Sequence, residues 1–259
     1  RLNLTAEKFG LGKKVLGNYY PNEKQGVFPS SEWKKKVIGQ NWYLGETFIT
    51  GIGQGYIQTN PLQLCLMTAQ LANGGYKIFP RITLKKNQDT VEQIKNKMQQ
   101  MSKIVKENDN SILSVTENFF EIKTKEYTPL YNNSENIKFV LDAMFKSTNE
   151  LYGTSYKSRI EDPKYQFAGK TGTSQVKRIT EAQRKLNLKI DQIPYKERDH
   201  AWYIAFGPYR NPRYAVSVLV EHGGSGSKVA APITKKLFKL IIDRHELREQ
   251  IKSKNKMNI

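Results

Sequence analysis

The amino-acid sequence predicts an α+β fold, in which helices pack with an antiparallel sheet. Two apolar β-type runs, at 201–206 and 214–221, are separated by Gly207-Pro208-Tyr209-Arg210-Asn211-Pro212, which is hairpin chemistry. Patterns typical of helices precede and follow these runs. At 259 residues the chain can bury a substantial core, and one domain or a large part of one is the expected organisation.

The chain is strongly basic, with 42 Lys and Arg against 24 Asp and Glu and a formal charge of +18. Such an excess of positive charge suggests nucleic acid or an anionic membrane surface as a binding partner. The lysines are spread through the whole sequence, however, and neither a zinc-finger spacing nor an RNP-like aromatic strip accompanies them. We therefore expect no nucleic-acid partner; a steep salt dependence of DNA binding would contradict this expectation.

The cysteine count and the histidine spacing support neither a disulfide nor a metal site. Cys65 is the only cysteine, which excludes an intrachain disulfide, and the spacing of the three histidines supports no metal site. We expect no metal and no cofactor, and we expect His200 and His222 to form hydrogen bonds at strand ends. The sequence has no apolar run of 18 residues and no signal-peptide pattern at Arg1, so any membrane anchor is expected outside this chain.

The strongest helix signal follows a turn-rich segment at 1–45. Thr59 or Asn60 provides a cap, Pro61 fits the first turn, and Asn73-Gly74-Gly75 provides a stop. The residues between are apolar nearly all round. This pattern predicts a buried helix with Cys65 as an inert core thiol.

Three further segments complete the expected elements. Residues 85–133 are rich in Lys, Asn, Gln and Glu and read as a peripheral insertion, with a solvated helix at 91–105 and a strand pair at 112–123. An amphipathic helix is predicted at 136–145, capped by Ser134. The two later β-type runs are apolar enough to have both faces covered, and a last helix is predicted from Ala230.

The stretch that carries chemistry is Lys170-Thr171-Gly172-Thr173. A lysine beside hydroxyl side chains and a glycine suits a carboxylate or a phosphate, because the glycine leaves the backbone accessible. The phosphate loop of nucleotide hydrolases fails here, since its opening glycine would fall at Lys164. The Gly-x-Gly-x-Gly run at 51–55 is a weak dinucleotide signal for a similar reason. Lys-Thr-Gly instead fits the third motif of penicillin-binding proteins and β-lactamases.

Several separated stretches occur in the order of that family: Trp33, 42–47, 51–56 with 59–61, 73–75, 153–154, 168–176, 200–208 and 220–232. The chain therefore resembles the C-terminal part of the transpeptidase domain of class B penicillin-binding proteins, in particular those of the cell-elongation machinery. The resemblance covers nearly all of residues 1–259 except the insertion. It implies a partial β-lactamase/transpeptidase-like (penicilloyl-serine transferase) fold.

The resemblance also implies roles for the four central residues. Lys170 supplies a positive field, Thr171 and Thr173 bind the terminal carboxylate of a peptidoglycan stem peptide, and Gly172 leaves room for it. The strand would lie beside the substrate as an additional β-pairing edge. The backbone N–H of Thr173 would be one of two oxyanion-hole donors, and the other would be the N–H of the nucleophilic serine.

The nucleophile of the family is a serine in a Ser-x-x-Lys motif at the start of a buried helix. Four formal matches occur in the sequence, and none has this context: Ser31/Lys34, Ser174/Lys177, Ser225/Lys228 and Ser253/Lys256. Ser134-Glu135-Asn136 and Ser147-Thr148-Asn149 match the second motif, Ser-x-Asn, but occur too late in the order. We expect both motifs upstream of Arg1, so the chain alone should lack acyl transfer.

The implied function of the parent protein is D,D-transpeptidation through an acyl-serine intermediate. Its implied partners are the peptidoglycan stem peptide, β-lactams in the full-length parent, and membrane proteins of the cell-elongation machinery. Its implied location is the bacterial inner membrane, with this domain facing the periplasm. The alternative from another class is a non-catalytic module that binds peptidoglycan or a partner protein.

Overall fold

The computed structural model describes residues 2–17, 20–82, 128–177, 188 and 190–257. The chain divides into two compact units, Arg1–Leu141 and Asp142–Ile259. The predicted helix at 91–105 and strand pair at 112–123 lie outside the described residues, as does most of the predicted insertion. In the described part no helix is long and apolar enough to cross a membrane.

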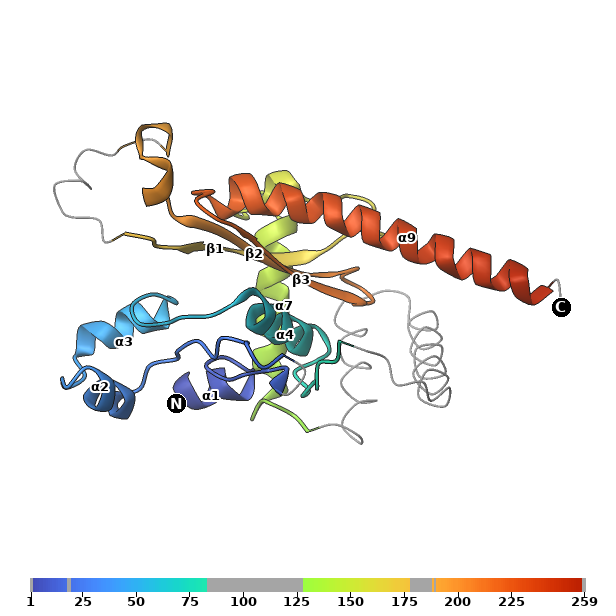
Figure 1. Cartoon of the computed structure of the whole chain (residues 1–259). Coiled ribbons are helices and arrows are strands. Elements are labelled where there is room, and N and C mark those ends of the chain that lie inside the picture. Colours follow the sequence, from blue (N-terminus) through green and yellow to red (C-terminus); the bar gives the residue numbers. More distant parts are fainter. Residues whose placement is uncertain (1, 18–19, 83–127, 178–187, 189, 258–259) are drawn as a thin grey trace. The chain divides into compact units, whose positions relative to one another are not determined.

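The first unit is built from short helices and irregular segments (Figure 1). Its helices are α1 (Leu2–Lys8), α2 (Ser31–Val37), α3 (Leu44–Gly51), α4 (Pro61–Ala72) and the first part of α7 (Ser134–Asn149). The predicted helix at 136–145 is therefore confirmed and is longer at both ends. Ser134 is its first residue, and the predicted cap is wrong in one detail: the Asn133 side chain accepts a hydrogen bond from the N–H of Glu135 at 2.9 Å.

Helix α4 begins and ends where the sequence predicts. The side chain of Asn60 accepts a hydrogen bond from the N–H of Gln63 at 2.9 Å, and Gln63 Oε1 accepts one from the N–H of Asn60 at 3.2 Å. The two bonds form a capping box. Two neighbouring glycines with positive φ, Gly74 and Gly75, follow the helix. Glycine adopts this conformation without steric cost, so the pair allows the chain to turn away.

The buried face of α4 differs from the prediction, because much of it is polar. Gln63, Thr68 and Gln70 are buried, whereas Cys65 is only half-buried. Gln63 Nε2 donates to the carbonyl oxygens of Lys13 and Gln25, both at 2.7 Å, and Gln70 Nε2 donates to that of Phe9 at 3.0 Å. Irregular segments leave backbone groups that no regular element pairs, so the helix presents amides to satisfy them.

The second unit contains a three-stranded antiparallel sheet in the order β1-β2-β3, with α9 packed against it (Figure 1). Its elements follow α7 in this order: η2 (Tyr156–Ser158), β1 (Ala168–Ser174), η3 (Ile190–Gln192), η4 (Tyr195–Glu197), β2 (His200–Gly207), β3 (Tyr214–Val220), η5 (Gly226–Ala230) and α9 (Ala231–Met257). The predicted hairpin is confirmed: β2 and β3 pair antiparallel, with Ala205 opposite Val216.

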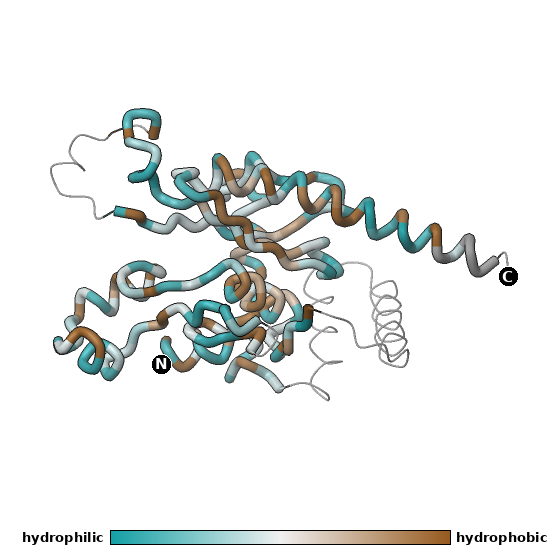
Figure 2. The backbone as a smooth tube through the Cα atoms, in the orientation of Figure 1, coloured by the Kyte–Doolittle hydropathy of each residue, from teal (hydrophilic) through white to brown (hydrophobic). Residues whose placement is uncertain are grey.

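The core of this unit lies between the sheet and α9. Phe167 and Phe238 stack with ring centroids 5.1 Å apart, and Tyr203 meets Phe167 edge-on at 6.4 Å. Apolar residues concentrate along the paired strands, and apolar and polar bands alternate along α9 (Figure 2). The prediction that β2 and β3 are each covered on both faces is wrong for the described residues. Burial in β2 alternates along most of the strand, and β3 is half-buried throughout.

Candidate active site

The predicted site residues Lys170, Thr171, Gly172 and Thr173 all lie on β1. In the part of the chain that the structure describes, β1 pairs only with β2 and is therefore an edge strand. Lys170 and Thr173 are exposed, and Thr171 and Gly172 are partly exposed. An edge strand with accessible polar side chains is the arrangement that β-addition of a peptide requires.

Lys170 presents a cation that no acid of the described residues neutralises. Its Nζ donates to the carbonyl oxygen of Thr171 at 2.8 Å and lies 3.4 Å from Thr171 Oγ1. Among the described residues no carboxylate lies within ion-pair distance of this ammonium group. The positive charge is therefore available to an anionic ligand beside the strand.

Two glycines allow β1 to approach its neighbours closely. A Cβ on Gly169 would lie 2.6 Å from the phenol oxygen of Tyr203, and a Cβ on Gly172 would lie 3.1 Å from Cβ of Trp202. Gly172 was predicted to leave room for a ligand. The structure adds a second reason for glycine at this position, which is its packing against β2.

A buried hydroxyl cluster in this unit was not predicted from the sequence. The phenol of Tyr203 lies 2.9 Å from Thr148 Oγ1 and 2.9 Å from Ser155 Oγ, and all three side chains are buried. Burial raises the pKa of the Tyr203 phenol, which keeps it neutral and able to donate. The Gly153-Thr154 landmark was the available signal, since Ser155 follows it directly. Nothing in the apolar run 201–206 marked its tyrosine as a hydrogen-bonding residue.

Of the serine–lysine matches, Ser31/Lys34 comes nearest to the expected motif, because Ser31 is the first residue of α2. The side chain of Lys34 is only 1% exposed, and its Nζ lies 2.6 Å from Glu46 Oε1 and 2.8 Å from the carbonyl oxygen of Asn41. A lysine that accepts a proton from serine must contact the serine hydroxyl. Lys34 Nζ instead contacts Glu46 and the carbonyl oxygen of Asn41, so Lys34 is unsuited to that role.

The other matches are used structurally. Lys177 pairs with Glu197 at 2.9 Å, Ser225 accepts from the N–H of Lys228 at 3.4 Å, and Ser253 donates to the carbonyl oxygen of Gln250 within α9. In the Ser147-Thr148-Asn149 match, Asn149 Nδ2 donates to the carbonyl oxygens of Phe145 and Phe167. None of these contacts places a lysine ammonium group against a serine hydroxyl.

The two histidines of the strand ends form hydrogen bonds, as predicted. The N–H of His222 donates to His200 Nδ1 at 2.9 Å, and His222 Nδ1 lies 3.0 Å from the carbonyl oxygen of Arg198. His222 has a φ of 55°, a left-handed conformation that these contacts hold in place. Within the described residues no group of three or more His, Cys, Asp and Glu side chains is arranged to hold a metal ion.

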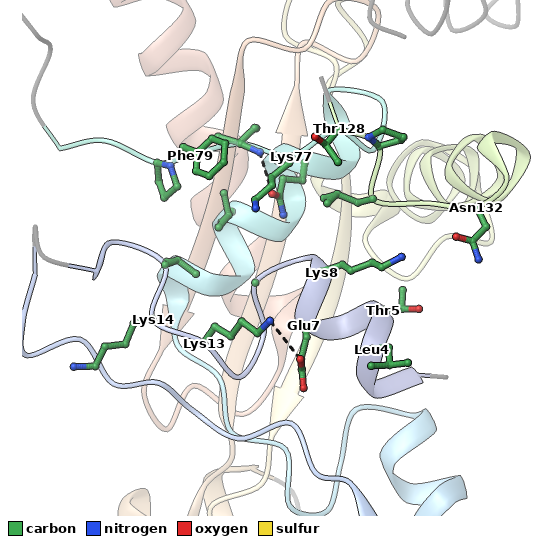
Figure 3. A pocket seen from close by; sticks show the side chains of 18 residues that line it. Leu4, Thr5, Glu7, Lys8, Lys13, Lys14, Lys77, Phe79, Thr128 and Asn132 are labelled. Carbon is green, nitrogen blue, oxygen red and sulfur yellow. Dashed lines mark hydrogen bonds and ion pairs between the residues drawn. The ribbon is translucent and has the colours of Figure 1, made fainter. Parts of the chain in front are cut away.

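A pocket of about 1140 Å³ lies in the first unit (Figure 3). It is lined by Lys8, Lys13, Lys14 and Lys77 and by apolar residues that include Leu66. Lys13 pairs with Glu7 at 3.3 Å, Lys14 donates to the carbonyl oxygen of Pro21, and Lys77 lies over the ring of Phe79. No residue of β1 lines this pocket, so it is not the site predicted from the sequence.

A three-stranded antiparallel sheet with a C-terminal helix and a Lys-Thr-Gly-Thr edge strand defines a part of the penicilloyl-serine transferase fold. The family profile "Penicillin binding protein transpeptidase domain" matches residues 1–239, and the chain belongs to this family.

Curated and solved relatives agree with this assignment. Peptidoglycan D,D-transpeptidase MrdA of Salmonella typhimurium (strain SL1344) is 32% identical over 243 residues, which are 94% of this chain and 34% of that protein. PBP2 of Pseudomonas aeruginosa, solved in complex with WCK 5153, is 32% identical with a TM-score of 0.64 over 92% of this chain and 43% of that one. PBP2 of Helicobacter pylori, solved with MreC, is 28% identical with a TM-score of 0.64 over 92% of this chain and 36% of that one. The chain spans about a third of the length of the curated relatives it matches.

Proposed function

We propose that this chain is the C-terminal part of a peptidoglycan D,D-transpeptidase that cross-links stem peptides through an acyl-serine intermediate. The observation that carries the proposal is the edge strand β1, which presents Lys170, Thr171 and Thr173 in a chain of the transpeptidase family. Relatives named peptidoglycan D,D-transpeptidase support the same reading.

In this proposal the strand receives the end of the stem peptide. The ammonium group of Lys170, which has no carboxylate beside it among the described residues, supplies a positive field. The hydroxyls of Thr171 and Thr173 bind the terminal carboxylate. The N–H of Thr173 donates to the oxyanion that forms when the acyl carbonyl is attacked, which lowers the barrier because charge develops there in the transition state.

The nucleophile and its lysine belong, in this proposal, to a segment that precedes Arg1. The ion pair between Lys34 and Glu46 supports this placement, because it removes the match that comes nearest to the motif. Partners proposed with the function are the stem peptide, β-lactams, and proteins of the cell-elongation machinery, as H. pylori PBP2 was solved with MreC. The proposed location is the bacterial inner membrane, with this domain facing the periplasm.

Covalent labelling by a fluorescent penicillin tests the proposal. The 259-residue chain should remain unlabelled, and a longer protein that includes the preceding segment should be labelled at one serine. In the longer protein, Lys170→Met should slow labelling at least tenfold, as expected when a charge-assisted contact is lost. Lys177→Met, which removes a charge paired with Glu197 near the same strand, serves as the control and should label at nearly the normal rate.

Two outcomes would contradict the proposal. Stoichiometric labelling of the 259-residue chain at Ser31 or another serine would place the nucleophile within it. Failure of the longer protein to react would favour a non-catalytic module that binds peptidoglycan or a partner protein.

A further inference from the structure

Three hydroxyl groups lie in a row that ends on Thr171. Ser147 Oγ lies 3.2 Å from Thr154 Oγ1, and Thr154 Oγ1 lies 3.5 Å from Thr171 Oγ1. Lys170 Nζ lies 3.4 Å from the same Thr171 oxygen. The row connects the last turn of α7 with β1, and every member belongs to the second unit.

The fold fixes the position of Thr154 although its side chain is exposed. The residue before it, Gly153, donates its N–H to the carbonyl oxygen of Glu150 at 2.8 Å, and the residue after it, Ser155, donates its N–H to that of Ser147 at 3.0 Å. A Cβ on Gly153 would lie 2.4 Å from the same Ser147 oxygen, so glycine is required for this approach. Thr154 is therefore held between two anchored neighbours.

The donor and acceptor capacity of a hydroxyl allows this row two directions, and one of them turns the Thr171 proton outward. A threonine hydroxyl has one proton and two lone pairs, and an ammonium group can only donate. Lys170 therefore occupies one lone pair of Thr171 Oγ1. When Ser147 donates to Thr154 and Thr154 donates to Thr171, the second lone pair is also occupied. The proton of Thr171 must then face a third group, which has to be an acceptor.

We propose that Thr154 is a positioning residue that orients the Thr171 hydroxyl as a donor to the terminal carboxylate of the substrate. This inference rests on the proposed function, which assigns that carboxylate to Thr171. A carboxylate only accepts hydrogen bonds, so its arrival selects the direction in which the Thr171 proton faces outward. The 3.5 Å separation of the two threonine hydroxyls is long for a hydrogen bond. Such contacts shorten when the ligand completes the network.

Two substitutions at position 154 separate the hydroxyl from the shape of the side chain. Thr154→Val keeps the shape and removes the hydroxyl, and Thr154→Ser keeps the hydroxyl. The probes are N-acetyl-D-alanyl-D-alanine and its C-terminal amide, which differ only in the carboxylate. Their dissociation constants for the 259-residue chain are measured from the NMR shifts of the Gly172 and Thr173 amides.

The proposal expects selective loss. The wild-type chain should bind the acid more tightly than the amide, and Thr154→Val should weaken binding of the acid by roughly five- to tenfold while changing that of the amide less than twofold. Thr154→Ser should restore the difference. Equal weakening of both probes would indicate a merely structural role, and unchanged binding of the acid would also overturn the inference.

A crystal structure of the Thr154→Val variant keeps this test separate from the proposed function. If the wild-type chain does not distinguish acid from amide, the assignment of the carboxylate to β1 fails. The Thr171 side-chain rotamer then decides only whether Thr154 positions that residue. A changed rotamer would support this positioning role, and an unchanged rotamer would overturn it.

Discussion

Gly226 of η5 lies against Gly172 of the candidate strand. A Cβ on Gly226 would be 2.7 Å from the carbonyl oxygen of Gly172 and 2.4 Å from that of Trp202. Because both contacts are with backbone atoms, no side chain can move aside to make room. The segment before α9 therefore determines how far β1 and β2 can shift.

Gly226→Ala should destabilise the second unit by about 1–3 kcal/mol, the usual cost of forcing an atom into a filled site. Trp202 is the only tryptophan in this unit, so a Trp33→Phe/Trp42→Phe background makes fluorescence-detected urea unfolding specific to it. Lys228→Ala is the control, because its side chain is exposed in the same segment η5, and it should change stability by less than about 0.5 kcal/mol. Equal stability of the two variants would contradict the packing argument.

Tyr203→Phe should destabilise the second unit by about 1–3 kcal/mol, because the buried hydroxyls of Thr148 and Ser155 each lose a hydrogen bond to the phenol. Thr148 keeps its bond to the carbonyl oxygen of Met144, Ser155 keeps its bond to that of Ser147, and Ser155 Oγ lies 3.5 Å from Thr148 Oγ1, which limits the loss. The matched control is Tyr152→Phe, since Tyr152 is 77% exposed. Urea unfolding of the two variants measures the difference, and a loss no larger for Tyr203→Phe than for Tyr152→Phe would show that the phenol contributes nothing.

Alkaline pH should weaken the second unit through its buried tyrosines. Burial raises the pKa of Tyr209 to about 12, whereas an unfolded tyrosine titrates near pH 10. The folded pKa is the higher one, so this contribution to stability is complete below pH 10 and is lost as the pH rises toward 12. Between pH 10 and 11 the loss should be about 1 kcal/mol.

Unfolding of wild type and Tyr209→Phe at pH 8, 9, 10 and 11 measures this contribution. The variant keeps the aromatic ring, whose centroid lies 4.3 Å from that of Phe145 in the wild type, and it lacks the ionisable phenol. Its stability should therefore fall less steeply above pH 10. Parallel pH profiles would exclude Tyr209 as a cause of the alkaline loss.

The elements of this fold were predictable where local sequence signals decide them. Asn60, Pro61 and the glycines after α4 fixed that helix from capping chemistry alone, and turn chemistry fixed the hairpin between β2 and β3. The burial of Gln63 and Gln70 was not predictable. It depends on carbonyl groups of Phe9, Lys13 and Gln25 that only the folded chain brings to the helix.

The candidate site shows the same division. Lys170, Thr171 and Thr173 could be found as a motif because they lie within four consecutive residues. The residues that contact them are distant in sequence. Thr154 Oγ1 lies beside Thr171 Oγ1 and is itself contacted by Ser147, and Gly226 packs against Gly172. The spacing of residues along one chain carries no such information, since it depends on how α7, β1 and η5 pack.

Lys34→Met should destabilise the first unit and change its response to acid. The hydrogen bond from Lys34 is the main cause that lowers the pKa of Glu46. With the folded pKa below the unfolded value, this contribution to stability is present above about pH 4.5 and is lost as the pH falls through the folded pKa. The wild type should therefore lose stability on acidification more steeply than Lys34→Met.

Lys35→Met, on the exposed side of the same helix, should retain the wild-type profile. Thermal unfolding from pH 7 to pH 3 in a Trp202→Phe background, followed by the fluorescence of Trp33 and Trp42, measures all three proteins. Identical acid profiles for the two variants would show that the buried ion pair does not govern this response.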